Sequence, residues 1–313
     1  MIDLYRGMVN TWECDEMGHM NVRFYVAKQM EGLAILAPYI GLPYAFRPRA
    51  SSTIQPFDQH IRFMKEVHPG GPLTMTGGIL EVTDDAALIY QELNHTNSGE
   101  PAAAFRTWVR HVDTNMGRAF PWNSQTLDAF DRYRIASPPE KTAPRSIDMT
   151  TEPVSNAIAH AATADELNIP VIGRCAVPPA HCDVHGRMAP EHFIGRVSDS
   201  VPNLLSGWRE EVAAASAAKG DVIKTGAAVL EYRLRYRSWP RAGDLIEVRS
   251  GLGRVMPKVH SLVHWMINTL TGAAYCTSEA VAVTLDLKAR KVVPTNEEHM
   301  AKLEARVPRG LKL

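Results

Sequence analysis

Apolar residues recur along the chain in two rhythms, one helical and one alternating. Between Tyr25 and Ala37 they recur every three or four positions, which predicts a helix over roughly Val22–Ala37. Gly41 and Pro43 follow and are expected to end this helix. Alternating runs come next and predict four strands, at Gln59–Met64, Leu73–Val82, Ala87–His95 and Ala103–Val112.

The same succession returns in the second half of the chain. Pro190 suits a first helical turn, and apolar residues continue after it at helical spacing. Because Pro202 lacks the N–H group that a helix interior uses, we expect two helical segments, 190–201 and 203–218. The strands predicted after them are Val229–Arg237, Leu245–Gly253, Lys258–Asn268 and Tyr275–Leu285.

Each half also begins with a short predicted strand, at Leu4–Asn10 and at Arg174–Val177. Antiparallel strands packed on one long helix are typical of the α+β class. Between the halves lies a different region, with one predicted helix at Ser124–Arg134 followed by a connection rich in Pro, Ser and Thr. We therefore expect an N-terminal unit (1–120), a linker with short helices (121–172) and a C-terminal unit (173–313).

The two halves are related by an internal duplication. Shifting the sequence by 168 residues places residues 6–20 on residues 174–188 with six identities in 15 positions. Unrelated sequences of ordinary composition would share about one. The shared frame, Cys-Asp-x-x-Gly-x-Met, occupies Cys14–Met20 and Cys182–Met188. One turn geometry, followed by a helix, is predicted at both places.

The bulk composition narrows the classes of function. Basic and acidic residues balance at 34 each in 313 residues, so no overall field favours nucleic acid or an anionic membrane. The N-terminus lacks a signal-peptide pattern, and no apolar run approaches the roughly 20 residues of a membrane helix. The four cysteines form no CxxC pair, and the histidines lack a spacing suited to a metal. We expect a reduced, cytoplasmic protein without a metal or cofactor.

The first turn carries the chemistry-bearing residues. The run Asp15-Glu16-Met17-Gly18-His19-Met20-Asn21, placed between a strand and a long helix, resembles the acyl-CoA thioesterases of the 4-hydroxybenzoyl-CoA thioesterase type, which have the hotdog fold. The resemblance implies two tandem hotdog units, each an antiparallel sheet wrapped around its long helix, that form an intrachain pseudo-dimer. It also implies a thioester site between adjacent units and an acyl-CoA or acyl-carrier-protein substrate.

The residues themselves suit thioester hydrolysis. A carboxylate can act as base or as direct nucleophile, and the N–H groups at a helix start can stabilise the carbonyl oxygen as it becomes negative. We assign the carboxylate to Asp15 and the orienting roles to His19 and Asn21, which match the family's positions. The N–H groups around Gly18 and Met20 are expected to polarise the carbonyl. The alternative is structural, because an Asp before a helix is often a turn or capping residue.

For the second turn the structural interpretation is the stronger one. The counterparts of His19 and Asn21 are Arg187 and Ala189, so Asp183 keeps the acid but loses both polar partners. His185 could line a pocket or be solvated. We therefore expect one principal site and one relic.

Two further residue types are open to more than one interpretation. Tyr25, one helical turn after Asn21, could shape a substrate pocket or pack in the core. Cys14 and Cys182 repeat, but nothing adjacent clearly activates either thiolate, so packing beside the turn explains them as well as a nucleophile does.

Two rival functions remain open at this level. A hotdog protein could bind or sense acyl-CoA without hydrolysing it. A hotdog enoyl-CoA hydratase or dehydratase is a weaker alternative, because the chain lacks the Asp, Asn-Pro and His run of that branch. Association of these double units into larger homo-oligomers is compatible with the fold.

Overall fold

The structure is a computed structural model that describes residues 1–217, 225–286, 288–289 and 291–313. The chain divides into two compact units. Unit 1 comprises Met1–Arg145 together with Pro178–Ile194, and unit 2 comprises Ser146–Val177 together with Gly195–Leu313. Residues 121–145 of the expected linker therefore pack with unit 1, and residues 146–172 pack with unit 2. In the described part of the chain, no helix combines the length and apolar character needed to cross a membrane.

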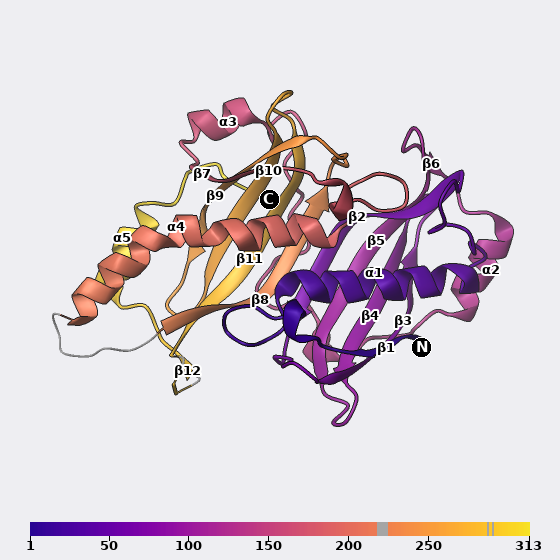
Figure 1. Cartoon of the computed structure of the whole chain (residues 1–313), viewed down its shortest axis with the longest axis horizontal. Helices are drawn as coiled ribbons and strands as arrows, with labels where there is room; N and C mark the ends of the chain where they lie inside the picture. The colour runs from indigo at the N-terminus through magenta and orange to yellow at the C-terminus, as the bar shows by residue number, and fades with distance from the viewer. Residues whose placement is uncertain (218–224, 287, 290) are drawn as a thin grey trace. The chain divides into compact units, whose positions relative to one another are not determined.

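Unit 1 is an antiparallel sheet with one long helix lying across it (Figure 1). The sheet order is β1-β3-β4-β5-β2, and every neighbouring pair is antiparallel. Its elements are β1 (Ile2–Met8), α1 (Val22–Tyr39), β2 (Ser52–Phe63), β3 (Pro72–Val82), β4 (Ala87–His95), β5 (Pro101–Asp113), β6 (Ala119–Phe120) and α2 (Ser124–Arg132).

Unit 2 repeats this topology, with the order β7-β9-β10-β11-β8 and antiparallel neighbours throughout. Each strand thus takes the place of its counterpart in unit 1, which confirms the predicted fold class, a two-domain hotdog architecture. The remaining elements are α3 (Ala161–Glu166), β7 (Val171–Ala176), α4 (Glu191–Ala217), β8 (Thr225–Tyr236), β9 (Leu245–Val255), β10 (His260–Asn268), β11 (Ala274–Asp286), β12 (Lys291–Val292) and α5 (Glu297–Glu304).

The structure differs from the elements predicted from the sequence at two places, and each of them contains a proline. The β2 strand begins at Ser52 rather than Gln59, because Pro56 is accommodated at a register shift between Pro56 and Asp58 in the pairing with β5. A bulge is one of the few places in a strand that tolerate a residue without an N–H donor.

The expected break in the second helix was also wrong. The α4 helix continues through Pro202 up to Ala217, and the predicted end at residue 218 lies outside the described residues. Proline removes a single donor, which a helix held by other contacts can tolerate with a kink. Such a contact lies beside it, since Asn203 Nδ2 donates a 2.7 Å hydrogen bond to the carbonyl oxygen of Ile172.

The core of unit 1 contains a network of buried amides between helix and sheet. Gln29 of α1 donates to Gln91 Oε1 of β4, and Gln59 Nε2 of β2 donates to Gln29 Oε1 at 3.1 Å. All three side chains are fully buried. Gly32 permits this close seating, because a Cβ there would lie 2.6 Å from Met75 Sδ. Polar pairing of this kind fixes the position of α1 along the sheet, since a slip would leave buried amides unpaired.

Unit 2 has a buried imidazole in the corresponding layer. His264 of β10 is almost fully buried, and its Nδ1 lies 2.6 Å from Ser250 Oγ of β9. Burial lowers the pKa of His264 from 6.5 to about 3, so the ring is neutral in the folded protein at ordinary pH.

This burial predicts an acid-sensitive contribution to stability. Between pH 6.5 and about 3, His264 is protonated in the unfolded chain but neutral in the folded protein. The contribution of this group to the free energy of unfolding is therefore fully present above this pH window and is lost as the pH falls through it. Going from about pH 7.5 to about pH 5.5 should lower the free energy of unfolding by about 1.4 kcal/mol through this group. Urea unfolding at both pH values measures the loss, which His264→Asn should remove.

Ser250→Ala is the matched control, because it deletes the hydrogen-bond partner but keeps the buried ring. It should lower stability at both pH values and retain the pH-dependent part. An unchanged pH dependence in His264→Asn would contradict the assignment.

Candidate active site

The turn that carries Asp15 is closed by its own backbone. Asp15 N donates to the His19 carbonyl and Gly18 N to the Asp15 carbonyl, both at 3.0 Å, and Cys14 pairs with Met20 as an isolated bridge. Gly18 has φ +78°, a left-handed conformation that a side chain would strain. Asp15 Oδ1 accepts from Met17 N at 2.9 Å. One carboxylate oxygen is therefore fixed by the turn.

The other carboxylate oxygen faces an imidazole. Asp15 Oδ2 lies 3.5 Å from His19 Nδ1, and the opposite ring nitrogen, Nε2, lies 3.8 Å from Glu66 Oε1. Both separations are ion-pair distances rather than hydrogen bonds. The side chains of His19, Asp15 and Glu66 are 18%, 20% and 30% exposed, so solvent reaches this row of carboxylate, imidazole and carboxylate. The structure thus brings together two predicted residues and adds Glu66, which the sequence analysis missed.

Asn21 caps α1. Its side chain accepts a 3.0 Å hydrogen bond from Arg23 N, and its backbone N donates to the Glu13 carbonyl at 2.9 Å. The cap is the reason that α1 begins at Val22, immediately after the Asp15 turn. The predicted role of Asn21 toward water or substrate stays a prediction.

The N–H groups of the turn are unequally available. Gly18 N and Met20 N, both expected to polarise the substrate carbonyl, already donate to the carbonyls of Asp15 and Val67. His19 N has no backbone acceptor within the described residues. Arg23 N and Phe24 N of the first turn of α1 likewise donate to Asn21, so a donor for a developing oxyanion is best sought at His19 N.

Residues 65–71, the connection from β2 to β3 that we call the strap, hold this turn from outside. Met20 N donates to the Val67 carbonyl at 2.8 Å, and His68 Nδ1 donates to the Gly18 carbonyl at 3.0 Å. Glu66 meets His19 on the adjacent position. Three consecutive strap residues thus each contact a different part of the turn.

The side chains of Met20 and Tyr25 are buried and are not exposed at the surface of the turn. They are 2% and 5% exposed, and the Tyr25 ring packs edge-on against Phe63 with centroids 5.2 Å apart. Burial raises the pKa of Tyr25 well above its usual range, so the hydroxyl stays protonated, and its oxygen accepts a hydrogen bond from the Val67 backbone N–H. Their observed role is to support the turn and the strap, and a direct substrate contact stays a prediction.

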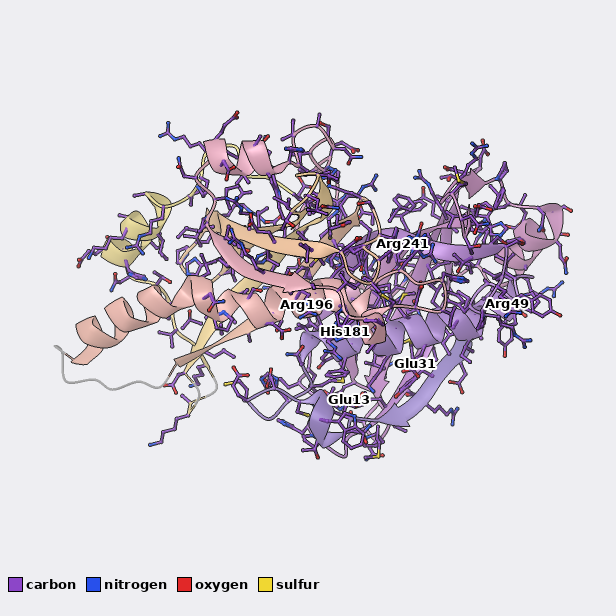
Figure 2. All side chains as sticks on the ribbon, turned by 45° about the horizontal axis from the view of Figure 1, so that its top comes forward. Glu13, Glu31, Arg49, His181, Arg196 and Arg241 are labelled. Atoms are coloured by element: carbon purple, nitrogen blue, oxygen red, sulfur yellow. The ribbon has the colours of Figure 1, made fainter. Side chains whose placement is uncertain are left out.

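A buried ion pair anchors the chain just before the turn. Lys28 Nζ of α1 lies 2.7 Å from Glu13 Oε1 and 3.3 Å from Tyr5 Oη, and Glu13 Oε2 accepts from Asn10 N at 2.8 Å. Burial alone would lower the pKa of Lys28, but its bonds to Glu13 and Tyr5 outweigh burial and raise it. The pair ties the turn to α1 (Glu13 is labelled in Figure 2).

The sequence profile of the Thioesterase-like superfamily matches residues 9–130 and 177–303, well over half of the chain. The chain belongs to the Thioesterase-like superfamily. The two matched segments contain the two turns, one in each segment, and the family assignment identifies the chain as a thioester hydrolase. Comparison with curated protein sequences finds no match.

Solved structures of two acyl-ACP thioesterases share the architecture of this Thioesterase-like chain. One is an acyl-ACP thioesterase from Bacteroides thetaiotaomicron, with a TM-score of 0.62, 11% identity, and coverage of 89% of this chain and 96% of the other. The second is the 12:0-ACP thioesterase from Umbellularia californica, with a TM-score of 0.65, 9% identity, and coverage of 93% of both chains. At these identities the likeness establishes the fold alone.

The second turn of this Thioesterase-like chain has the same backbone geometry as the first. Asp183 N donates to the Arg187 carbonyl at 2.7 Å, Gly186 N donates to the Asp183 carbonyl at 3.0 Å, and Gly186 has φ +73°. Asp183 Oδ1 accepts from His185 N at 2.8 Å, as Asp15 Oδ1 does from Met17 N. Each bond lies 168 residues after its counterpart in the first turn.

The side chains of the second turn are used differently. Arg187 Nη2 lies 3.3 Å from Asp183 Oδ2, the oxygen that corresponds to the one facing His19 in the first turn. His185 Nε2 donates to the Ala45 carbonyl at 3.2 Å. Asp183 and His185 thus make contacts within the turn and to the Ala45 carbonyl in this structure, and a substrate contact for either stays a prediction.

Cysteine and metal chemistry have little support at these turns. Cys14 Sγ donates to the Asn10 carbonyl at 3.5 Å, and Cys182 Sγ to the Pro178 carbonyl at 3.8 Å, so the two thiols are equivalent structural contacts. Burial, together with the carboxylates of Asp15 and Glu13, raises the pKa of the Cys14 thiol. Among the described residues, no group of three or more His, Cys, Asp or Glu side chains could hold a metal ion.

The protonated state of Cys14 leads to a direct prediction. Cys14→Ser keeps a donor for the Asn10 carbonyl and should leave the turnover number within about twofold of the wild type, because a thiol with a raised pKa is a poor nucleophile at neutral pH. Thioester hydrolysis by the two proteins, measured alongside their thermal unfolding, checks this. A folded Cys14→Ser protein without activity would restore the cysteine mechanism.

Proposed function

We propose that the protein hydrolyses acyl thioesters of coenzyme A or of an acyl-carrier protein, with Asp15 as the catalytic carboxylate. This proposal rests on the placement of the Asp15 carboxylate in the turn before α1. Its Oδ2 atom lies 3.5 Å from His19 Nδ1, and its Oδ1 atom accepts a hydrogen bond from Met17 N. The run Asp15–Asn21 matches the 4-hydroxybenzoyl-CoA thioesterase type residue by residue at its Asp, His and Asn positions. The names of the two similar structures support a carrier-protein thioester as one substrate class.

The carboxylate can act by two routes. As a base, Asp15 takes a proton from water while the water oxygen attacks the thioester carbonyl carbon. The C–S bond of the tetrahedral intermediate then breaks, and the departing thiolate takes up that proton, leaving a free acid and a thiol. As a nucleophile, Asp15 attacks the thioester carbonyl carbon, the C–S bond breaks and the thiolate leaves. Water then attacks the aspartyl carbonyl of the resulting mixed anhydride, which releases the acid and regenerates Asp15, and a proton from that water passes to the thiolate. A single turnover in ¹⁸O-water separates them, because the nucleophile route leaves ¹⁸O in the Asp15 carboxylate.

Charge on the carbonyl oxygen would be stabilised at the helix start. His19 N has no backbone acceptor among the described residues and lies two residues before Asn21, the cap of α1, at the positive end of the helix dipole. A donor of this kind is worth roughly 3–4 kcal/mol in related acyl chemistry. The left-handed Gly18 allows the turn to fold back beside the helix terminus.

Glu66 completes the acid–base row in this proposal. With carboxylates on both sides, the His19 ring is held with Nδ1 toward Asp15 and Nε2 toward Glu66. His19 would then keep Oδ2 of Asp15 aimed at the reacting water or carbonyl. Glu66 acts through His19 and is a positioning residue rather than a catalytic one.

Asp15→Asn is expected to lower the turnover number at least about 100-fold, the usual scale for loss of a catalytic base or nucleophile. The amide keeps an oxygen for Met17 N, so the turn should survive. Release of free thiol from a panel of acyl-CoAs and acyl-carrier-protein thioesters, followed with a thiol reagent, measures the loss.

Asp183→Asn is the matched control in the second turn and should stay within about threefold of the wild-type turnover number, as expected for a residue outside the chemistry. A folded Asp15→Asn protein with full activity would refute the assignment. A wild-type protein that binds acyl-CoA but releases no thiol would favour the non-hydrolytic alternative, and hydration of an enoyl-CoA would favour the hydratase.

A double-mutant cycle tests the role of Glu66. If Glu66 acts through His19, Glu66→Gln should lower the turnover number about tenfold in the wild type and change it less than about twofold in a His19→Gln background. Glu66→Asp should recover part of the loss. Glu16→Gln removes the same charge from an exposed position of the same turn and is the control. Equal losses from Glu66→Gln in both backgrounds would show that Glu66 does not act through His19.

A further inference from the structure

The loop from α1 to β2 encloses a hollow that the proposed chemistry does not use. Its volume is about 450 Å³, within the range of small-ligand sites. The hollow is lined by Gly41, Leu42, Pro43, Tyr44, Ala45, Arg47, Pro48, Arg49, Ala50, Ser51 and Ser52, so its lining contains two guanidinium groups and no carboxylate.

The two arginines are available for a ligand. Both are exposed, and neither makes an ion pair within the described part of the chain. Arg47 is held over the ring of Tyr44, with its guanidinium carbon 5.2 Å from the ring centroid. Other arginines of this unit are engaged with protein groups, for example Arg62 with the Ala143 carbonyl and Arg110 with Asp85.

Arg49 is also strained. Its φ is +67°, and Asn168 is the other residue besides glycine with a positive φ in the described chain. Asparagine tolerates this region well, whereas a long side chain such as arginine carries a cost. Residues with such backbone strain cluster at functional sites, and Arg49 is one of the residues that line the hollow.

The hollow lies away from the Asp15 turn. The whole of α1 separates Asn21 from Gly41, and 18 helical residues span about 27 Å. Figure 2 places Arg49 at one end of unit 1 and Glu13, which precedes the Asp15 turn, at another. The second turn, rather than the first, contacts the hollow. His185 of that turn donates a hydrogen bond to the carbonyl of Ala45, which lines the hollow.

We propose that this hollow is a phosphate-binding site, separate from the Asp15 site, in which Arg47 and Arg49 clamp the phosphate of a nucleotide and Tyr44 offers its ring to the base. Paired guanidinium groups match the charge and the oxygen geometry of a phosphate, which carries close to two negative charges. The exposed ring of Tyr44 suits stacking by a flat base. The site stands beyond the proposed hydrolytic function and does not depend on it.

Calorimetric titration tests the site with adenosine 3′,5′-bisphosphate, inorganic phosphate and phosphate-free adenosine. We expect saturable binding of the two phosphate ligands and none of adenosine. Binding of the bisphosphate that is at least about tenfold tighter than that of inorganic phosphate identifies a nucleotide as the source, and equal affinities identify phosphate alone. The absence of saturable binding of either phosphate ligand would overturn the proposal.

Variants assign the binding to the hollow. Arg47→Gln/Arg49→Gln should weaken binding of the bisphosphate at least about tenfold. Arg49→Gly should weaken it too, and it also relieves the left-handed strain, so it folds even if the double variant does not. Arg6→Gln removes an exposed arginine of β1 that is paired with Asp3, and it should have no effect.

Activity measurements show whether the site is separate. The KM for an acyl-CoA should stay within about twofold in Arg49→Gly, because the phosphates of the substrate would be held elsewhere. A KM that rises in parallel with the loss of bisphosphate binding would overturn the separation of the two sites. Unchanged bisphosphate affinity in Arg49→Gly would overturn the role of the hollow itself.

Discussion

The candidate site depends on one backbone hydrogen bond, the 2.8 Å contact from Met20 N to the carbonyl of Val67. It joins the Asp15 turn to a strap 47 positions further along the chain (67 minus 20). The Val67 backbone N–H donates to the Tyr25 hydroxyl oxygen, so the strap, the turn and α1 meet at one buried residue. The neighbours of Val67 also contact the turn, Glu66 at His19 and His68 at Gly18.

The part of this arrangement that sequence could predict is the local part. The turn, the helix that follows it and the predicted strands that match β3, β4 and β5 rest on short-range patterns and on the 168-residue repeat. Glu66 could not be found this way. It lies in a Lys-Glu-Val-His-Pro-Gly-Gly run that is typical of an ordinary connection between strands, and its proximity to His19 exists only once β2 has paired with β5 and β3 has paired with β1. Pro56 and Pro202 were misjudged for a related reason, because tertiary contacts can offset a local cost.

The duplication separates what the backbone of the turn requires from what chemistry requires. Both turns share three features. Each has a glycine in the left-handed conformation, and each has an aspartate whose side chain accepts a hydrogen bond from the backbone N–H two residues later. Each also has a cysteine whose thiol donates to the carbonyl four residues earlier. The groups around that frame differ. At the 168-residue offset, His181 and Arg196 stand in place of Glu13 and Lys28, the buried pair of the first half. The shared residues are those that the turn needs in order to fold, so their presence alone does not make a turn catalytic.

The two carboxylates show how small the difference is. In both turns one oxygen is committed to a backbone N–H, and only the second oxygen is left to vary. In the second turn that oxygen meets the always-charged guanidinium of Arg187, whose pairing with it leaves no group that can take and return a proton. In the first turn it meets an imidazole, which can be either a donor or an acceptor near neutral pH. The exchange of histidine for arginine is one of several differences between the two turns, and it changes the group that faces the second carboxylate oxygen.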